Sequence, residues 1–221
     1  MKYVFAAFGG SGSTELIRRL SSRYVVGNKP DAVFFTQLGA VRIDQGTFAE
    51  RSRGFSPPPG ATLQQAVTAY CRWLAARPDH TAVFNTAAGE GVFSAAGIPD
   101  VVFLLRHPVH AYVSWAKPER HGSLLEQFGG VNSEPGVTWY ARRWKLAARE
   151  YLRLRAARIP CALVRYEHAE RDARSLPELR AIFAGFDGGR RNPGVLRPEL
   201  EELMFESVRI VYSELYPSWA V

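Results

Sequence analysis

Short apolar runs alternate with segments of helical periodicity along this chain. The apolar runs are rich in β-branched and aromatic residues, which is typical of strands covered on both faces of a sheet. They span residues 2–8, 31–36, 81–85, 100–106 and 160–167. Apolar residues recur with helical spacing over residues 13–23, 63–77, 109–116, 137–157 and about 198–215.

This alternation of strands and helices predicts a three-layer α/β/α sandwich around a mainly parallel central sheet. The length of 221 residues fits one domain, residues 1–221. Three successive prolines predict an exposed loop over residues 46–61, because proline fixes φ and removes a backbone donor. Residues 117–136 are polar and glycine-rich, which predicts a mobile segment.

Composition narrows the class of protein. A hydrophobic fraction of 47% favours a globular protein over a disordered one. No apolar stretch approaches the roughly 20 residues of a membrane span, and no secretory signal is present, so we expect a cytoplasmic protein without a membrane partner. The two cysteines, Cys71 and Cys161, show no metal-ligand spacing; we expect reduced, structural thiols and no bound metal.

The net charge of +7 suits a polyanionic partner. Nucleic acid is one such partner, and a small ligand with several phosphates is another. Charge alone leaves both open, but the sequence contains no known RNA or DNA motif, so we expect no nucleic-acid partner.

The stretch VFAAFGGSGSTELIRRL, residues 4–20, has the order of strand, small-residue loop and helix. In such a βα turn, glycines allow a close approach of the backbone, and the N–H groups and dipole of the helix start favour an anion. A tight turn without a ligand is the alternative. The residues of this loop that could bind phosphate or sulfate oxygens are Gly10, Ser11, Gly12, Ser13 and Thr14.

Two familiar nucleotide motifs do not fit this loop. A nucleotide-hydrolysing P-loop requires a lysine before its Ser or Thr, and the loop has none. In the dinucleotide fingerprint G-x-G-x-x-G, Glu15 stands where the third glycine belongs. The loop therefore indicates neither an ATPase nor a dinucleotide-binding enzyme.

A second candidate site lies in VVFLLRHPVHAYVSWA, residues 101–116. Arg106 ends a predicted strand, Pro108 begins a helix, and Ser114 follows the arginine by eight positions. Arginine binds a phosphate through two parallel hydrogen bonds, and a nearby serine can donate another. Two anion sites on neighbouring βα units suit a nucleoside that is phosphorylated at both ends.

With these two motifs the chain resembles sulfotransferases that use 3′-phosphoadenosine 5′-phosphosulfate, most closely in pattern the heparan-type and bacterial small-molecule members. The resemblance implies a P-loop NTPase-like sulfotransferase fold. It also implies that residues 10–14 bind the 5′-phosphosulfate and that Arg106 and Ser114 bind the 3′-phosphate. The reaction would move a sulfuryl group to a hydroxyl or amine of a small molecule or sugar, leaving 3′-phosphoadenosine 5′-phosphate.

Two later segments extend the resemblance. In ALVRYEHAERD, residues 162–172, Tyr166 matches a tyrosine that lies against adenine; the alternative is a core tyrosine at a strand end. In GGRRNPGVLRPEL, residues 188–200, Arg190 matches a basic turn over the 3′-phosphate; the alternative is a solvated turn.

The general base is less clearly marked. The histidine segment of the phenol and steroid enzymes is absent, since Asn85, Thr86 and Ala87 stand there. The heparan-type enzymes carry a glutamate before two phenylalanines, and DAVFF at 31–35 places Asp31 at that position. An ordinary loop residue is the alternative for Asp31. Glu15 and Glu90 are fallback carboxylates.

Gly10 is the main departure from the family pattern, because a lysine or arginine that steadies the leaving group is expected there. Either another cation replaces it, or the protein is a non-catalytic module that binds the nucleotide. The candidate replacements are Arg18, Arg19, Lys29, Lys117 and Arg120. We expect the acceptor pocket to form from residues 37–60 and 117–136.

Overall fold

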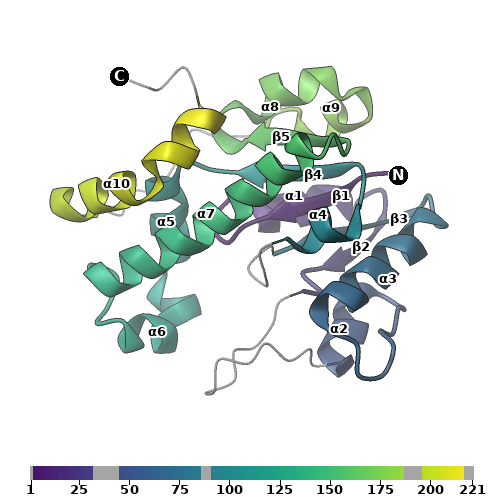
Figure 1. Cartoon of the computed structure of the whole chain (residues 1–221), viewed down its shortest axis with the longest axis horizontal. Helices are drawn as coiled ribbons and strands as arrows, with labels where there is room; N and C mark the ends of the chain where they lie inside the picture. Colours follow the sequence, from purple (N-terminus) through teal and green to yellow (C-terminus); the bar gives the residue numbers. More distant parts are fainter. Residues whose placement is uncertain (1, 32–44, 86–90, 187–195, 217–221) are drawn as a thin grey trace.

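The computed structural model of the protein describes residues 2–31, 45–85, 91–186 and 196–216. A five-stranded parallel sheet with the order β2-β3-β1-β4-β5 forms its centre (Figure 1). This architecture confirms the predicted α/β class. The strands are β1 Val4–Ala7, β2 Val25–Asn28, β3 His80–Phe84, β4 Val101–Leu105 and β5 Cys161–Arg165.

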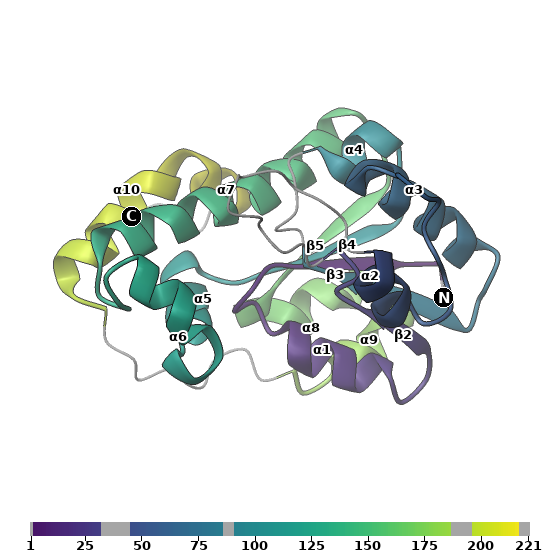
Figure 2. The ribbon, with the colours of Figure 1, turned by 90° about the horizontal axis from the view of Figure 1, so that it is seen from below.

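Helices cover both faces of the sheet, which gives three layers (Figure 2). One face carries α1 (Ser13–Leu20), α8 (Ala169–Asp172) and α9 (Pro177–Phe183). The other carries α3 (Leu63–Ala75), α4 (Val92–Ala96) and α7 (Glu134–Ala156). The remaining helices are α2 (Gln45–Ser52), α5 (Pro108–Trp115), α6 (Pro118–Gln127) and α10 (Pro198–Leu215), with 3₁₀ turns at Tyr166–His168 and Ala173–Ser175.

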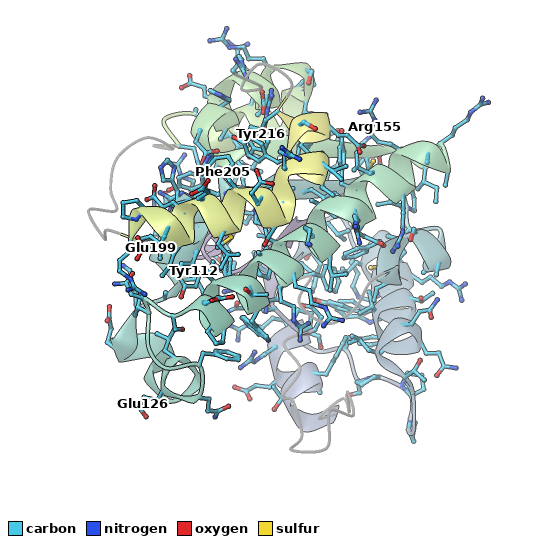
Figure 3. The ribbon with its side chains drawn as sticks, turned by 60° about the vertical axis from the view of Figure 1, so that its left-hand side comes forward. Tyr112, Glu126, Arg155, Glu199, Phe205 and Tyr216 are labelled. Carbon is cyan, nitrogen blue, oxygen red and sulfur yellow. The ribbon has the colours of Figure 1, made fainter. Side chains whose placement is uncertain are left out.

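Side chains of the central strands alternate between two apolar cores. In β4, Val101, Phe103 and Leu105 face the α7 side, while Val102 and Leu104 face the α1 side. All five are fully buried, as expected of a strand with period-two alternation between two helical layers. On the α7 side, α10 packs along α7; Phe205 lies on α10, and Tyr216 directly follows its last residue (Figure 3).

The connections reverse direction at the middle of the sheet. From β1 the chain crosses α1 to β2 on one side, whereas from β4 it passes through α5, α6 and α7 to β5 on the other. Right-handed crossovers in opposite directions place their helices on opposite faces. The carboxyl ends of β1 and β4, which pair side by side, therefore form a topological switch point, where open α/β sheets bind ligands.

Several predicted elements differ from the observed ones. The second strand is Val25–Asn28, not 31–36, of which residues 32–36 lie outside the described residues. Helix α1 ends at Leu20 instead of residue 23. The strand β2 was not predicted because Gly27 interrupts its apolar run. Gly27 lies under the Tyr70 hydroxyl, where a Cβ would come within 2.2 Å of that oxygen.

Two segments predicted to lack regular structure contain helices. Helix α2 begins at residue 45 and is anchored by the buried Phe48, and α6 lies within 117–136 and is anchored by the buried Leu125. Tertiary packing of such buried side chains stabilises short helices that are marginal on their own. The three prolines at 57–59 remain outside regular structure, as predicted.

Two global expectations can be compared with the structure. Within the described ranges, no helix combines the length and apolar character needed to cross a membrane. Cys71 is a buried free thiol and Cys161 a half-buried one.

Candidate anion-binding site

The loop between β1 and α1 has glycines at two positions that require them. Gly10 and Gly12 have φ values of 85° and 86°, in the left-handed region. A Cβ at Gly10 would lie 2.0 Å from the Ala111 carbonyl oxygen of α5, and one at Gly12 would lie 2.3 Å from the ring of Tyr166. The loop is therefore pressed between α5 and the residue that follows β5.

The start of α1 carries backbone N–H groups for which no acceptor lies within the described residues. Its N-cap is Gly12, which has no side chain to accept them, and no other described residue accepts a hydrogen bond from this first turn. Ser11, just before it, is fully buried, and among the described residues its Oγ has no hydrogen-bond partner. An oriented helix start and a buried hydroxyl together make a site that suits an anion.

The two neighbouring βα turns contain carboxylates from the chain itself. Glu150 of α7 is 2% exposed and accepts the N–H groups of Gly91, Phe93 and Ser94 at the start of α4, at 2.7–2.9 Å. Glu167 accepts the N–H of His107, before α5, at 2.8 Å. The turn after β1 thus differs from its neighbours, because no carboxylate of the described chain fills it.

A hydrogen bond and a nearby imidazole keep Glu167 in its charged form. Burial raises the pKa of this carboxyl, but the nearby His110 imidazole, whose Nδ1 lies 3.8 Å from Oε1, and the hydrogen bond from the His107 backbone outweigh burial and hold its pKa below the usual value. The imidazole of His107 is packed against Phe205 and Tyr212, and burial lowers its pKa to about 4. His107 is therefore neutral near pH 7.

Arg106 extends from the end of β4 to the loop after β1. The residue is 7% exposed, and its carbonyl accepts a hydrogen bond from Trp144 at 2.9 Å. Its Nη1 lies 3.4 Å from the Gly10 carbonyl oxygen, and its guanidinium lies 4.6 Å from the centre of the Tyr166 ring. The structure therefore brings together Arg106, Tyr166 and the glycines of the loop.

Tyr166 is half-buried and forms one wall of this cluster. Its ring covers Gly12 on one side and meets the edge of Phe186 at 5.2 Å between centroids. Phe186 is the last described residue before the basic segment that contains Arg190, so the predicted role of Arg190 lies outside the described residues.

Ser114 is half-buried near the end of α5, and its side chain forms no hydrogen bond within the described part of the chain. Its helix runs along the loop: Ala111, one turn earlier, lies against Gly10, and the Trp115 ring lies against Gly9. Ser114 is thus on the correct helix, but the structure shows no contact between it and Arg106.

Asp31 lies at the same edge of the sheet, two strands away from β1. It is 4% exposed, and its Oδ1 accepts the N–H of Asn85 at 2.6 Å. This bond joins the chain after β2 to the chain after β3. The predicted base is therefore a buried carboxylate at the carboxyl edge, next to residues 32–44 and 86–90, which lie outside the described ranges.

The other candidate catalytic groups either have structural partners or lie outside the described residues. Hydrogen bonds and charge from Arg18 and Arg19 lower the pKa of Glu15 to about 2, which makes it a poor base. Arg18 is exposed and paired with Glu15. Arg19 donates to the carbonyls of Ile182, Ala184 and Gly185, which end α9. Glu90 lies outside the described residues, as does the side chain of Arg120.

Sequence reasoning missed Glu150 as a structural anion. The signal was present, because this charged residue occupies the apolar face of a long helix between Ala147 and Tyr151. A buried carboxylate at such a position requires several hydrogen-bond donors. Its donors come from α4, a five-residue helix that the sequence pattern did not predict.

Comparisons with known proteins add no assignment: no family model matches the chain, and neither curated proteins nor solved structures contain a significant match.

Proposed function

We propose that the protein is a sulfotransferase that transfers a sulfuryl group from 3′-phosphoadenosine 5′-phosphosulfate to a hydroxyl or amine. One observation supports this most strongly: the start of α1 and the buried Ser11 hydroxyl, neither of which has a hydrogen-bond partner among the described side chains, lie at the topological switch point of the sheet. The order of the two sequence motifs selects this nucleotide from other phosphorylated ligands.

In this proposal the 5′-phosphosulfate binds the backbone and hydroxyl groups of residues 10–14. The half-buried ring of Tyr166 packs against adenine, and Ser114 and Arg190 bind the 3′-phosphate. The acceptor is a small molecule or carbohydrate, held by residues 37–60 and 117–136. The reaction requires no metal, because N–H donors and arginine supply the positive charge.

The chemical step is an in-line displacement at sulfur. The acceptor oxygen or nitrogen forms a bond to sulfur while the bond between sulfur and the 5′-phosphate oxygen breaks. The acceptor proton passes to Asp31, and the electron pair of the broken bond stays on the phosphate oxygen. The products are the sulfated acceptor and 3′-phosphoadenosine 5′-phosphate.

A turnover assay with labelled donor and a panel of hydroxyl and amine acceptors tests this proposal. We expect acceptor-dependent release of 3′-phosphoadenosine 5′-phosphate. Asp31→Asn should lower kcat about a hundredfold, because a general base contributes on that order, while the amide oxygen can still accept the Asn85 N–H. Asp79→Asn, an exposed carboxylate, is the matched control. An undiminished rate in Asp31→Asn would remove Asp31 as the base.

A second candidate function is a non-catalytic module that binds the same nucleotide. The contact between Gly10 and the Ala111 carbonyl favours it, because no side chain can occupy the family's cation position. Tight binding of 3′-phosphoadenosine 5′-phosphate without turnover of any acceptor would support this candidate over the enzyme.

A further inference from the structure

Position 10 in the loop after β1, where the family carries its cation, has no space for a side chain. A Cβ at Gly10 would meet a backbone oxygen of α5 at 2.0 Å, and that atom cannot move unless the helix moves. The positive charge that a phosphate in this loop needs must therefore come from another element of the chain.

Two arginines near the loop in sequence do not supply it. The Arg18 side chain is 70% exposed and paired with Glu15 on the outer surface of α1. Arg19 holds three carbonyl oxygens at the end of α9. Both guanidiniums have structural partners away from the first turn of α1.

Arg106 lies against the loop from the opposite side. Its Nη1 lies 3.4 Å from the Gly10 carbonyl oxygen, and its guanidinium lies over Tyr166, whose ring in turn covers Gly12. These contacts hold the guanidinium beside the loop, against the Gly10 carbonyl and the ring that covers Gly12. Within the described chain, its Nε is buried without a hydrogen-bond partner, as is Ser11 Oγ.

The turn that Arg106 itself begins is less suited to an anion. Glu167 already accepts the His107 N–H at the start of α5 and carries a negative charge there. A phosphate at that helix start would face a fixed carboxylate, whereas a phosphate in the β1 loop faces N–H groups, a hydroxyl and the guanidinium.

We propose that Arg106 is the transfer cation: it binds the 5′-phosphate held by the β1 loop and neutralises the phosphate oxygen that keeps the electron pair when the bond to sulfur breaks. This inference rests on the proposed function and revises the role that the resemblance implies for Arg106, which is binding of the 3′-phosphate. In this arrangement Ser114 binds the 3′-phosphate, and Arg106 does not contact it.

Two nucleotides separate these roles. Adenosine 3′,5′-bisphosphate carries both phosphates, and adenosine 5′-phosphate carries only the one assigned to the loop. Calorimetry measures the affinity of the protein for the bisphosphate. The affinity for the monophosphate is measured by competition, from how well it displaces the bisphosphate. Arg106→Gln should lower the affinity for both nucleotides by the same factor, about tenfold or more, which is the effect of a lost charge-assisted hydrogen bond. Ser114→Ala should weaken the bisphosphate alone.

Further variants guard against a loss of folding. Arg106→Lys keeps the positive charge but loses the two parallel hydrogen bonds of the guanidinium. It should therefore lower the affinity for both nucleotides equally, but by less than Arg106→Gln. Arg149→Gln removes an exposed arginine on α7 and should leave both affinities unchanged. Thermal unfolding of each variant identifies any that does not fold, and Arg106→Lys alone still distinguishes the two roles.

Loss of bisphosphate affinity alone in either Arg106 variant would overturn this inference and leave the proposed function standing. Wild-type protein that binds neither nucleotide would remove both. In the turnover assay, the inference also predicts that Arg106→Lys lowers kcat by a larger factor than it raises the KM of the donor, because charge on the leaving oxygen develops in the transition state.

Discussion

Two helices of this fold begin at glycines of nearly identical conformation but differ in what faces them. Gly12 before α1 and Gly91 before α4 have φ values of 86° and 85°. At α4, the buried Glu150 accepts three backbone N–H groups. At α1, no described side chain accepts any, and a buried serine hydroxyl adds a further donor without a partner.

The start of α4 shows that a helix start in this fold can stabilise a buried anion. Burying a carboxylate costs free energy unless hydrogen bonds and nearby positive charge offset the loss of water. Glu150 is 2% exposed, so the start of α4 provides that compensation. The start of α1 offers the same groups at the ligand-binding edge, and we infer that an external anion takes the place that Glu150 has at α4.

The largest effect should follow from removing the internal anion. Glu150→Ala leaves three buried N–H groups without an acceptor, and we expect the free energy of unfolding to fall by about 4 kcal/mol. Urea denaturation measures the change. Arg153→Ala removes only an exposed neighbour, 4.0 Å from the same carboxylate, and should cost less than about 1 kcal/mol. Equal effects of the two variants would contradict a capping role for Glu150.

The two N-cap glycines provide a matched pair of substitutions. Alanine at either position strains the left-handed backbone, which costs about 1 kcal/mol. At Gly12 the new Cβ would also meet Tyr166 at 2.3 Å, whereas at Gly91 its nearest neighbours are 3.9 Å away. Gly12→Ala should therefore lower the free energy of unfolding by about 3 kcal/mol, with overpacking added to strain. Equal losses would mean that Tyr166 does not press on the loop.

Ser11→Ala should have the smallest effect on stability, and with the opposite sign. Its hydroxyl is buried without a partner in the described structure, so its removal should raise the free energy of unfolding of the free protein by about 1 kcal/mol. The same change should weaken 3′-phosphoadenosine 5′-phosphate about tenfold. Thermal unfolding and calorimetry measure the two effects; a loss of stability without a loss of affinity would assign Ser11 to the core.

The sequence predicted the central strands and the α1 loop well because their patterns are local. β1, β3, β4 and β5 are continuous apolar runs, and the glycines mark the turn directly. β2 escaped because its glycine lies under Tyr70, a contact 43 positions away in the chain. Helices α2 and α6 were not predicted because their segments are mostly polar, although the buried Phe48 and Leu125 pack them against the rest of the protein.

The candidate site was predicted in part for the same reason. Arg106, Tyr166 and the glycines each follow a strand that the sequence predicts, and because these strands are parallel the residues lie together at the carboxyl edge; their binding roles stay predictions. The closure of position 10 by Ala111 and the carboxylates at the other two turns depend on contacts between distant segments. The closure of position 10 leaves no local pattern in the sequence, and Glu150 is marked only as a charged residue on the apolar face of α7, a signal that does not identify its donors.

The most direct test of the account is amide NMR of the ¹⁵N-labelled protein during titration with 3′-phosphoadenosine 5′-phosphate. We expect the largest shifts at the amides of residues 10–15, at the start of α1, and none at residues 91–94, where Glu150 already occupies the helix start. Shifts absent from residues 10–15 at saturating nucleotide, or no binding at all, would contradict the claim that this loop is the phosphate site.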